Sequence, residues 1–103
     1  PKFGVYFTRT RIMKQDGSDF ISEYMPSITN FGIRPTLDGK KKLFETHILN
    51  YENFFKNNEI YDRRIFVELL GFLREEKKFN SFETLKHQIL NDVKMAKLFH
   101  ENK

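Results

Sequence analysis

An acidic residue near the middle of the sequence, Glu45, has the surroundings that a general base requires. It falls in the alternating stretch LFETHILN, in which Leu43, His47 and Leu49 share its face. A carboxylate held on a rigid strand in a half-apolar setting can accept the proton of a hydroxyl group. The same pattern is typical of an exposed strand glutamate that only solvates a sheet, and periodicity alone favours that interpretation. Glu68 has a similar context, and we assign it no role.

A second candidate is the charged segment REEKK at residues 74–78, which is followed directly by Phe79. Cations beside an aromatic ring could bind an aromatic ligand through stacking and hydrogen bonds. The alternative is a solvated connection between two elements, which composition alone favours. A group of aromatic residues is equally open, because part of it could fill a core and part could cover a ligand ring. Its members are Tyr51, Phe54, Phe55 and Tyr61.

Other kinds of chemistry find little support in the sequence. It contains no glycine-rich phosphate loop of the Walker or dinucleotide-binding type. The three histidines, His47, His87 and His100, are too scattered for a paired metal site, and we expect His87 and His100 to be solvated surface residues. The absence of cysteine excludes disulfide bonds and zinc–thiolate sites.

The charge balance favours anionic partners. The 103 residues carry a net charge of +4, which suits nucleotide phosphates, nucleic acid or solubility alone. The basic residues form no stripe interleaved with aromatic residues, so nucleic acid is the less favoured partner. No apolar run approaches the roughly 18 residues that span a bilayer, and nothing resembles a signal peptide. We therefore expect a cytoplasmic protein with no membrane partner.

Several strands must position these side chains. Period-two alternation and flanking turn residues predict five of them. They are Phe3–Ile12, Phe20–Tyr24, Ser27–Ile33, Leu43–Asn50 and Arg64–Phe72. Turns are expected at residues 15–19 and 37–40, and Pro26 is expected to interrupt the second strand at an edge or bulge. The last strand is apolar on both faces, so we expect it to be central.

A helix is predicted after the last strand. Asn80 or Ser81 provides its N-cap, and apolar residues spaced three and four apart form one stripe over four to five turns. The stripe consists of Phe82, Leu85, Ile89, Val93, Ala96 and Phe99. Antiparallel strands followed by one helix predict a single domain, a small antiparallel β-barrel with the helix packed outside.

Three segments resemble the riboflavin kinase family. SITNFGIRPT at residues 27–36 is similar to the family's xNxGxRPT stretch, and FETHIL at residues 44–49 is similar to its ETHIL strand. Residues 60–81 end in FLREEKKFNS, which matches the family's FLRxExxFxS. The tripeptide at residues 4–6 fits the preceding GVY strand, so the resemblance covers almost the whole chain.

The resemblance implies a mainly β fold, a six-stranded, Greek-key-like antiparallel barrel with one C-terminal helix outside. It implies transfer of the γ-phosphoryl group of ATP, with Mg²⁺, to the terminal ribityl hydroxyl of riboflavin, which yields FMN. Glu45 falls on the glutamate of the ETHIL strand, which accepts or orients the proton of the attacking hydroxyl. The other implied contacts are Ile48, Asn50 and Tyr61 for the nucleotide, and Arg74, Lys77 and Phe79 for the flavin.

The sequence departs from the family pattern at two places. The PTAN motif, which holds magnesium in the family upstream of the GVY strand, is absent, so no metal ligand is assigned. We therefore expect residues 1–103 to be a riboflavin kinase domain without its N-terminal strand, weakly active or inactive in isolation. Tyr61-Asp62 also replaces the usual Tyr-Gly, which alters a tight turn.

The family resemblance also implies partners beyond the two substrates. It predicts an FMN adenylyltransferase module ahead of this domain, in a bifunctional FAD synthetase, although a kinase-only parent stays open. Two other functions stay open as well: a basic barrel that binds single-stranded nucleic acid, and a non-catalytic flavin-binding domain.

Overall fold

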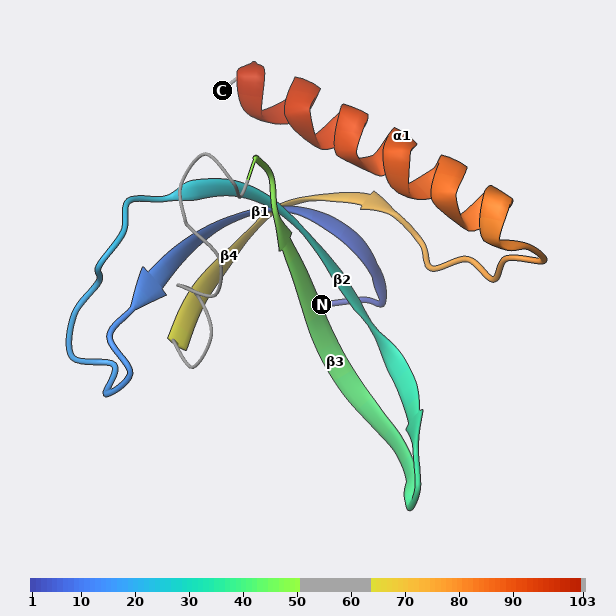
Figure 1. The fold of residues 1–103 in the computed structure, drawn as a ribbon, viewed down its shortest axis with the longest axis horizontal. Coiled ribbons are helices and arrows are strands. Elements are labelled where there is room, and N and C mark those ends of the chain that lie inside the picture. The colour runs from blue at the N-terminus through green and yellow to red at the C-terminus, as the bar shows by residue number, and fades with distance from the viewer. Residues whose placement is uncertain (51–63, 103) are drawn as a thin grey trace.

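One curled antiparallel sheet and one helix make up the computed structural model, which describes residues 1–50 and 64–102. The strands are β1 (Gly4–Met13), β2 (Met25–Thr36), β3 (Gly39–Ile48) and β4 (Arg64–Arg74), and the helix is α1 (Phe82–Glu101). The strands lie in the order β3-β2-β1-β4, which is the Greek-key order of four strands. In Figure 1, α1 lies across one end of the strongly curled sheet. The mainly β fold with one C-terminal helix is therefore confirmed.

The face of the sheet turned away from α1 carries a ladder of hydroxyl groups. Thr8 Oγ1 lies 2.7 Å from Ser27 Oγ and 3.0 Å from Thr29 Oγ1, and Thr10 Oγ1 lies 2.8 Å from Ser27 Oγ. The ladder continues to β3, where Thr46 Oγ1 lies 2.8 Å from Thr29 Oγ1. The first four of these residues are fully buried, so the hydroxyl groups satisfy one another away from water.

The opposite face of the sheet packs against α1. Its buried cluster consists of Val5, Ile28, Leu49 and Ala96, with Phe7, Leu73 and Val93 packed against it. Ala96 is 0% exposed, and its small side chain brings the helix backbone close to the sheet. The Phe7 and Phe99 rings stack at 4.2 Å between centroids. This stacking joins β1 to the C-terminal end of α1.

The helix begins where the sequence predicts. Ser81 is the N-cap, and its hydroxyl accepts a hydrogen bond from the Thr84 amide. Of the predicted stripe Ala96 is buried and Val93 and Phe99 are partly buried, whereas Ile89 is 49% exposed and Phe82 is 76% exposed. His87 is exposed as predicted. The prediction for His100 is wrong, because the helix end packs on β2 and His100 Nε2 donates to the Ser27 carbonyl at 3.3 Å.

Two predictions on the strands are wrong. The segment Phe20–Tyr24 makes only one isolated bridge, between Met13 and Phe20. The guanidinium of Arg11 stacks on the rings of both Phe20 and Tyr24, so side-chain contacts replace a ladder there. Pro26 lies inside β2, as its second residue, and its carbonyl accepts a hydrogen bond from the Leu49 amide at 2.9 Å.

A third wrong prediction concerns β4. Within the described sheet it has β1 as its one neighbour and lies at an edge, so it is not central there. Two of its aromatic residues contact other rings, Phe72 with Tyr6 edge-on at 5.2 Å and Phe66 with Phe20 at 6.1 Å, whereas Ile65 and Leu69 are exposed.

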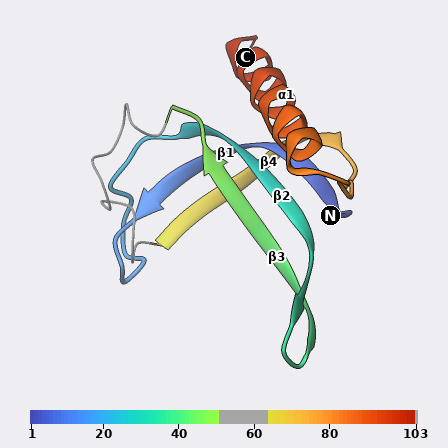
Figure 2. The same ribbon diagram turned by 45° about the vertical axis from the view of Figure 1, so that its right-hand side comes forward.

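The β2–β3 hairpin is longer than predicted. β3 starts at Gly39, four residues before the predicted start, and continues the pairing up to Thr36 opposite Gly39. Gly39 has a φ of 143°, a conformation that favours glycine, which suits the start of this strand. Figure 2 shows the hairpin extending away from α1. Within residues 1–50 and 64–102, no helix has the length and hydropathy needed to cross a membrane.

Candidate functional site

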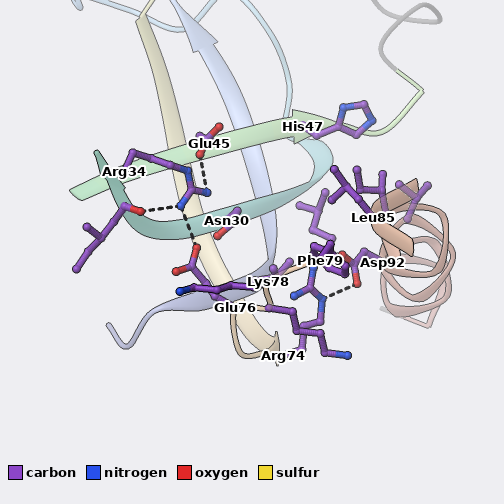
Figure 3. A pocket seen from close by; sticks show the side chains of 16 residues that line it. Asn30, Arg34, Glu45, His47, Arg74, Glu76, Lys78, Phe79, Leu85 and Asp92 are labelled. Carbon is purple, nitrogen blue, oxygen red and sulfur yellow. Dashed lines mark hydrogen bonds and ion pairs between the residues drawn. The ribbon is translucent and has the colours of Figure 1, made fainter. Parts of the chain in front are cut away.

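A cavity of about 690 Å³ lies between the sheet and the N-terminal half of α1, within the size range of small-molecule sites. Its walls come from all four strands, from the segment after β4 and from α1 (Figure 3). Apolar side chains from β1, β2 and α1 line part of the wall: Val5, Ile28, Ile33, Leu85, Ile89 and Val93. The charged and polar side chains of the lining are Asn30, Arg34, Glu45, His47, Arg74, Glu76, Lys77, Lys78 and Asp92, and Phe79 completes it.

At one side of the cavity Arg34 links two carboxylates. Its Nη2 lies 2.8 Å from Glu45 Oε1, and its Nη1 donates to Glu76 Oε1 at 3.1 Å (Figure 3). The hydrogen bond to Glu76, together with the negative charge of Glu45, raises the pKa of Arg34 above its ordinary value. The guanidinium therefore stays charged at neutral pH.

A glycine makes room for this arrangement. A Cβ atom at Gly32 would overlap the carboxylate of Glu76 and would lie 2.7 Å from Arg34 Nη1. Glu76 reaches this position from the segment after β4, far away in the sequence. The glycine of the NFGIRPT stretch thus lets the two side chains meet over the β2 backbone.

At the other side of the cavity Arg74 is bound to α1. Its Nε donates to Asp92 Oδ1 at 2.9 Å and its Nη2 donates to Asp92 Oδ2 at 2.7 Å (Figure 3). Gln88, one turn earlier on α1, donates to Asp92 Oδ1 at 2.9 Å and accepts from Lys77 Nζ at 3.1 Å. Asp92 is only 6% exposed, so its charge depends on these partners.

Four of the predicted site residues meet in this cavity. Glu45 of β3 lines it together with Arg74, Lys77 and Phe79, which come from the end of β4 and the segment after it. The Glu45 side chain is 55% exposed, and it comes from β3 directly opposite Asn30 of β2. One cavity therefore brings together a carboxylate, two cations and an aromatic ring.

The predicted nucleotide contacts lie elsewhere or outside the described residues. Ile48 is buried in a second cluster with Ile12 and Met25, on the face of the sheet away from the cavity. Asn50 is exposed and has a φ of 54° in the turn after β3. Tyr61 lies outside the described residues. All three stay predictions.

Several residues of the site were not singled out by sequence reasoning. Arg34 lies in the stretch SITNFGIRPT, but the sequence pattern does not indicate that it binds Glu45 and Glu76. Gln88 and Asp92 are spaced four apart on the helix beside the apolar stripe, and a carboxylate at such a position is a signal for a buried partner. Asn30 Oδ1 is buried without a hydrogen-bond partner among the described residues.

The family resemblance implies Mg²⁺, which binds through carboxylate and other oxygen ligands. In the described part of the chain, no group of three or more His, Asp or Glu side chains could hold a metal ion. The carboxylates of the cavity are engaged by arginines instead: Glu45 and Glu76 by Arg34, and Asp92 by Arg74. These residues do not fit a metal centre, and none is assigned to one.

Comparison with known proteins identifies one family for almost the whole chain. The flavokinase family model, described as riboflavin kinase, matches residues 1–100. A bifunctional riboflavin kinase/FMN adenylyltransferase of Haemophilus influenzae is 34% identical over 99 residues, which cover 96% of this chain and 28% of that protein. A protein of the same description from Pseudomonas fluorescens is 38% identical over 99 residues, covering 94% of this chain and 27% of that protein. The chain therefore spans little more than a quarter of these relatives.

A solved structure supports the fold. The crystal structure described as a macrolide-efflux protein from Streptococcus pneumoniae matches with a TM-score of 0.72 at 25% identity. The match covers 94% of this chain and 28% of that one. The similarity of fold thus extends over the sheet and the helix together.

Proposed function

Because the chain belongs to the riboflavin kinase family, we propose that it binds riboflavin and ATP and transfers the terminal phosphoryl group of ATP to riboflavin. The observation that carries the proposal is the common cavity of Glu45, Arg74, Lys77 and Phe79. In the reaction a bond forms between the terminal ribityl oxygen and the γ-phosphorus, and the bond from that phosphorus to the β,γ-bridging oxygen breaks. ADP leaves, and FMN is the product.

Glu45 is the proposed base. Its carboxylate accepts or orients the proton of the attacking hydroxyl, which frees an oxygen lone pair to form the new bond. The 2.8 Å contact with Arg34 supports this role, because the guanidinium holds the carboxylate in one place. Phosphoryl transfer depends mostly on positioning and charge stabilisation, and an oriented carboxylate contributes to the positioning of the attacking hydroxyl.

The other side of the cavity is the proposed flavin site. Arg74, Lys77 and Phe79 supply two cations and an aromatic ring, and Leu85 and Ile89 of α1 add apolar surface. This combination suits a planar heteroaromatic ring with hydrogen-bond acceptors at its rim. The ribityl chain would then extend from that ring toward Glu45.

The nucleotide site is proposed from the family resemblance. Ile48, Asn50 and Tyr61 are its proposed contacts, and a divalent cation would neutralise charge on the phosphates. In the proposed full-length protein, an FMN adenylyltransferase module accompanies this domain, because the relatives from Haemophilus influenzae and Pseudomonas fluorescens are described as bifunctional.

Two measurements test the proposal. Riboflavin fluorescence is titrated with the protein, and FMN formation is followed by chromatography with ATP and MgCl₂ present. We expect saturable quenching by riboflavin and ATP-dependent formation of FMN. If riboflavin fluorescence is not quenched and a short single-stranded oligonucleotide binds in a parallel titration, the cavity is a nucleic-acid site and the flavin proposal is wrong.

A further inference from the structure

Two polar side chains of α1 are placed to hold two cations of the proposed flavin site. Arg74 and Asp92 form a bidentate ion pair, with N–O distances of 2.9 and 2.7 Å. The side chains of this pair are 16% and 8% exposed, so it is largely withdrawn from water. Other ion pairs on the sheet are more exposed: Arg9 and Glu68 retain 42% and 39%.

The guanidinium of Arg74 is held at three of its donors. Besides the two bonds to Asp92, Nη1 donates to the backbone carbonyl of Glu75 at 2.9 Å. A long cationic side chain loses considerable rotamer freedom when it is fixed in this way, and that loss occurs on folding. A ligand that binds beside Arg74 therefore does not have to order it.

Gln88 extends the same network to a second cation. Its amide nitrogen donates to Asp92, and its amide oxygen accepts from Lys77 Nζ. The amide thus couples the position of Lys77 to the same buried carboxylate. All but Gln88 of these residues line the cavity.

We propose that Asp92 and Gln88 are positioning residues for the flavin, which act through Arg74 and Lys77. The proposal rests on the proposed function. Asp92 neutralises the charge of Arg74 and leaves it as an oriented hydrogen-bond donor and stacking surface. That end of the cavity then suits an uncharged heteroaromatic ring better than an anionic group, and the docking of α1 becomes a condition for flavin binding.

A purely structural role is the competing explanation, because a buried ion pair between β4 and α1 also docks the helix. The two explanations differ in what the pair does for each substrate. A structural role changes the unfolding temperature of Asp92→Asn, and it leaves the riboflavin affinity of Gln88→Met unchanged because the Arg74–Asp92 ion pair stays intact there. A positioning role changes the affinity for riboflavin and leaves the KM for ATP unchanged.

The test uses Asp92→Asn and Gln88→Met, with riboflavin affinity measured by fluorescence quenching and the KM for ATP measured in parallel. We expect Asp92→Asn to weaken riboflavin binding about tenfold and Gln88→Met about threefold, the range for loss of a single oriented polar contact. Glu68→Gln, which removes the negative charge of the Arg9–Glu68 pair away from the cavity, is the control and should leave riboflavin binding unchanged.

A double-mutant cycle with Arg74→Met decides how Asp92 acts. If Asp92 works through Arg74, Asp92→Asn has little further effect on riboflavin binding once Arg74 is replaced. Unchanged riboflavin affinity in a folded Asp92→Asn protein would overturn the positioning role and leave the kinase proposal intact. If that variant does not fold, Gln88→Met decides in the same way. Absence of riboflavin binding by the unmodified protein would overturn both proposals.

Discussion

Arg34 and Glu45 meet across β2 and β3 at 2.8 Å, although neither is the other's partner in the strand register. The residue directly opposite Arg34 is Lys41, and the residue directly opposite Glu45 is Asn30. Like charges directly opposite one another repel. The Arg34 guanidinium instead binds the carboxylate of Glu45, which is not its register partner. This contact orients the Glu45 carboxylate in the lining of the cavity.

Replacement of the proposed base tests the chemistry separately from the fold. Glu45→Gln keeps an oxygen that can accept from Arg34 and removes the capacity to accept a proton. We expect kcat to fall by roughly 10²–10⁴-fold, the usual contribution of a positioned acid or base. The Kd for riboflavin and the unfolding temperature should change little, because the side chain is 55% exposed.

The matched control for this variant is Glu68→Gln on β4, which changes a carboxylate outside the cavity in the same way. Its kcat should equal that of the unmodified protein. A Glu45→Gln protein with undiminished kcat would remove Glu45 from the reaction.

Gly32→Ala tests whether the space over β2 matters for the site. The added methyl group would occupy the position of the Glu76 carboxylate, so the Arg34–Glu76 contact must break. We expect kcat/KM to fall roughly tenfold, equivalent to about 1.4 kcal/mol. The free energy of unfolding should fall by less than about 1 kcal/mol, because Glu76 is a flexible, partly exposed side chain whose ion pair contributes little.

Gly71→Ala on β4 is the control, since a Cβ there would meet the Phe7 ring at an ordinary 3.5 Å. Loss of backbone entropy in the unfolded chain should make this variant as stable as the unmodified protein or stabilise it by up to about 1 kcal/mol. Equal kcat/KM values for the two alanine variants would show that the space at Gly32 has no part in function.

Thr8→Val tests the hydroxyl ladder. The valine side chain has a similar shape, and it would leave the hydroxyl groups of Ser27 and Thr29 without their common partner. Urea denaturation should show a loss of about 1–3 kcal/mol of unfolding free energy, the contribution of two lost hydrogen bonds, since Ser27 keeps Thr10 and Thr29 keeps Thr46 as a partner. Thr36→Val, at the exposed end of β2, should stay within about 0.5 kcal/mol. A similar small effect at both positions would contradict a stabilising ladder.

Ala96→Leu tests the close approach of α1 to the sheet. Ala96 is fully buried against Val5, Ile28 and Leu49, so three additional carbon atoms must displace the helix. We expect a loss of about 1–3 kcal/mol in unfolding free energy and weaker riboflavin binding, because the helix carries one wall of the cavity. Leu90→Ala, at a position that is 59% exposed on the same helix, is the control and should preserve riboflavin binding. Unchanged stability of Ala96→Leu would mean that α1 is not docked through this residue.

Much of the fold could be predicted because it follows from local patterns. Alternation along β3 correctly placed Glu45, His47 and Leu49 on one face, and the Ser81 cap defined the start of α1. The segment Phe20–Tyr24 was predicted as a strand, but its rings stack with the guanidinium groups of Arg9 and Arg11, and it forms no ladder of backbone hydrogen bonds. Apolar residues on both faces of β4 were interpreted as a central strand, but Ile65, Phe66 and Leu69 stay 38–45% exposed at an edge of the described sheet.

The sequence by itself determined the family, the mainly β class with its terminal helix, and the face of β3 on which the candidate base lies. Only the tertiary structure decided which partners meet: Arg34 with Glu76, which are 42 residues apart, and Arg74 with Asp92, which are 18 residues apart. The physical reason is that residue periodicity depends on the geometry of one element, whereas an ion pair or a cavity depends on how two elements are placed. That placement results from the curl of the whole sheet and from the docking of α1 at Ala96.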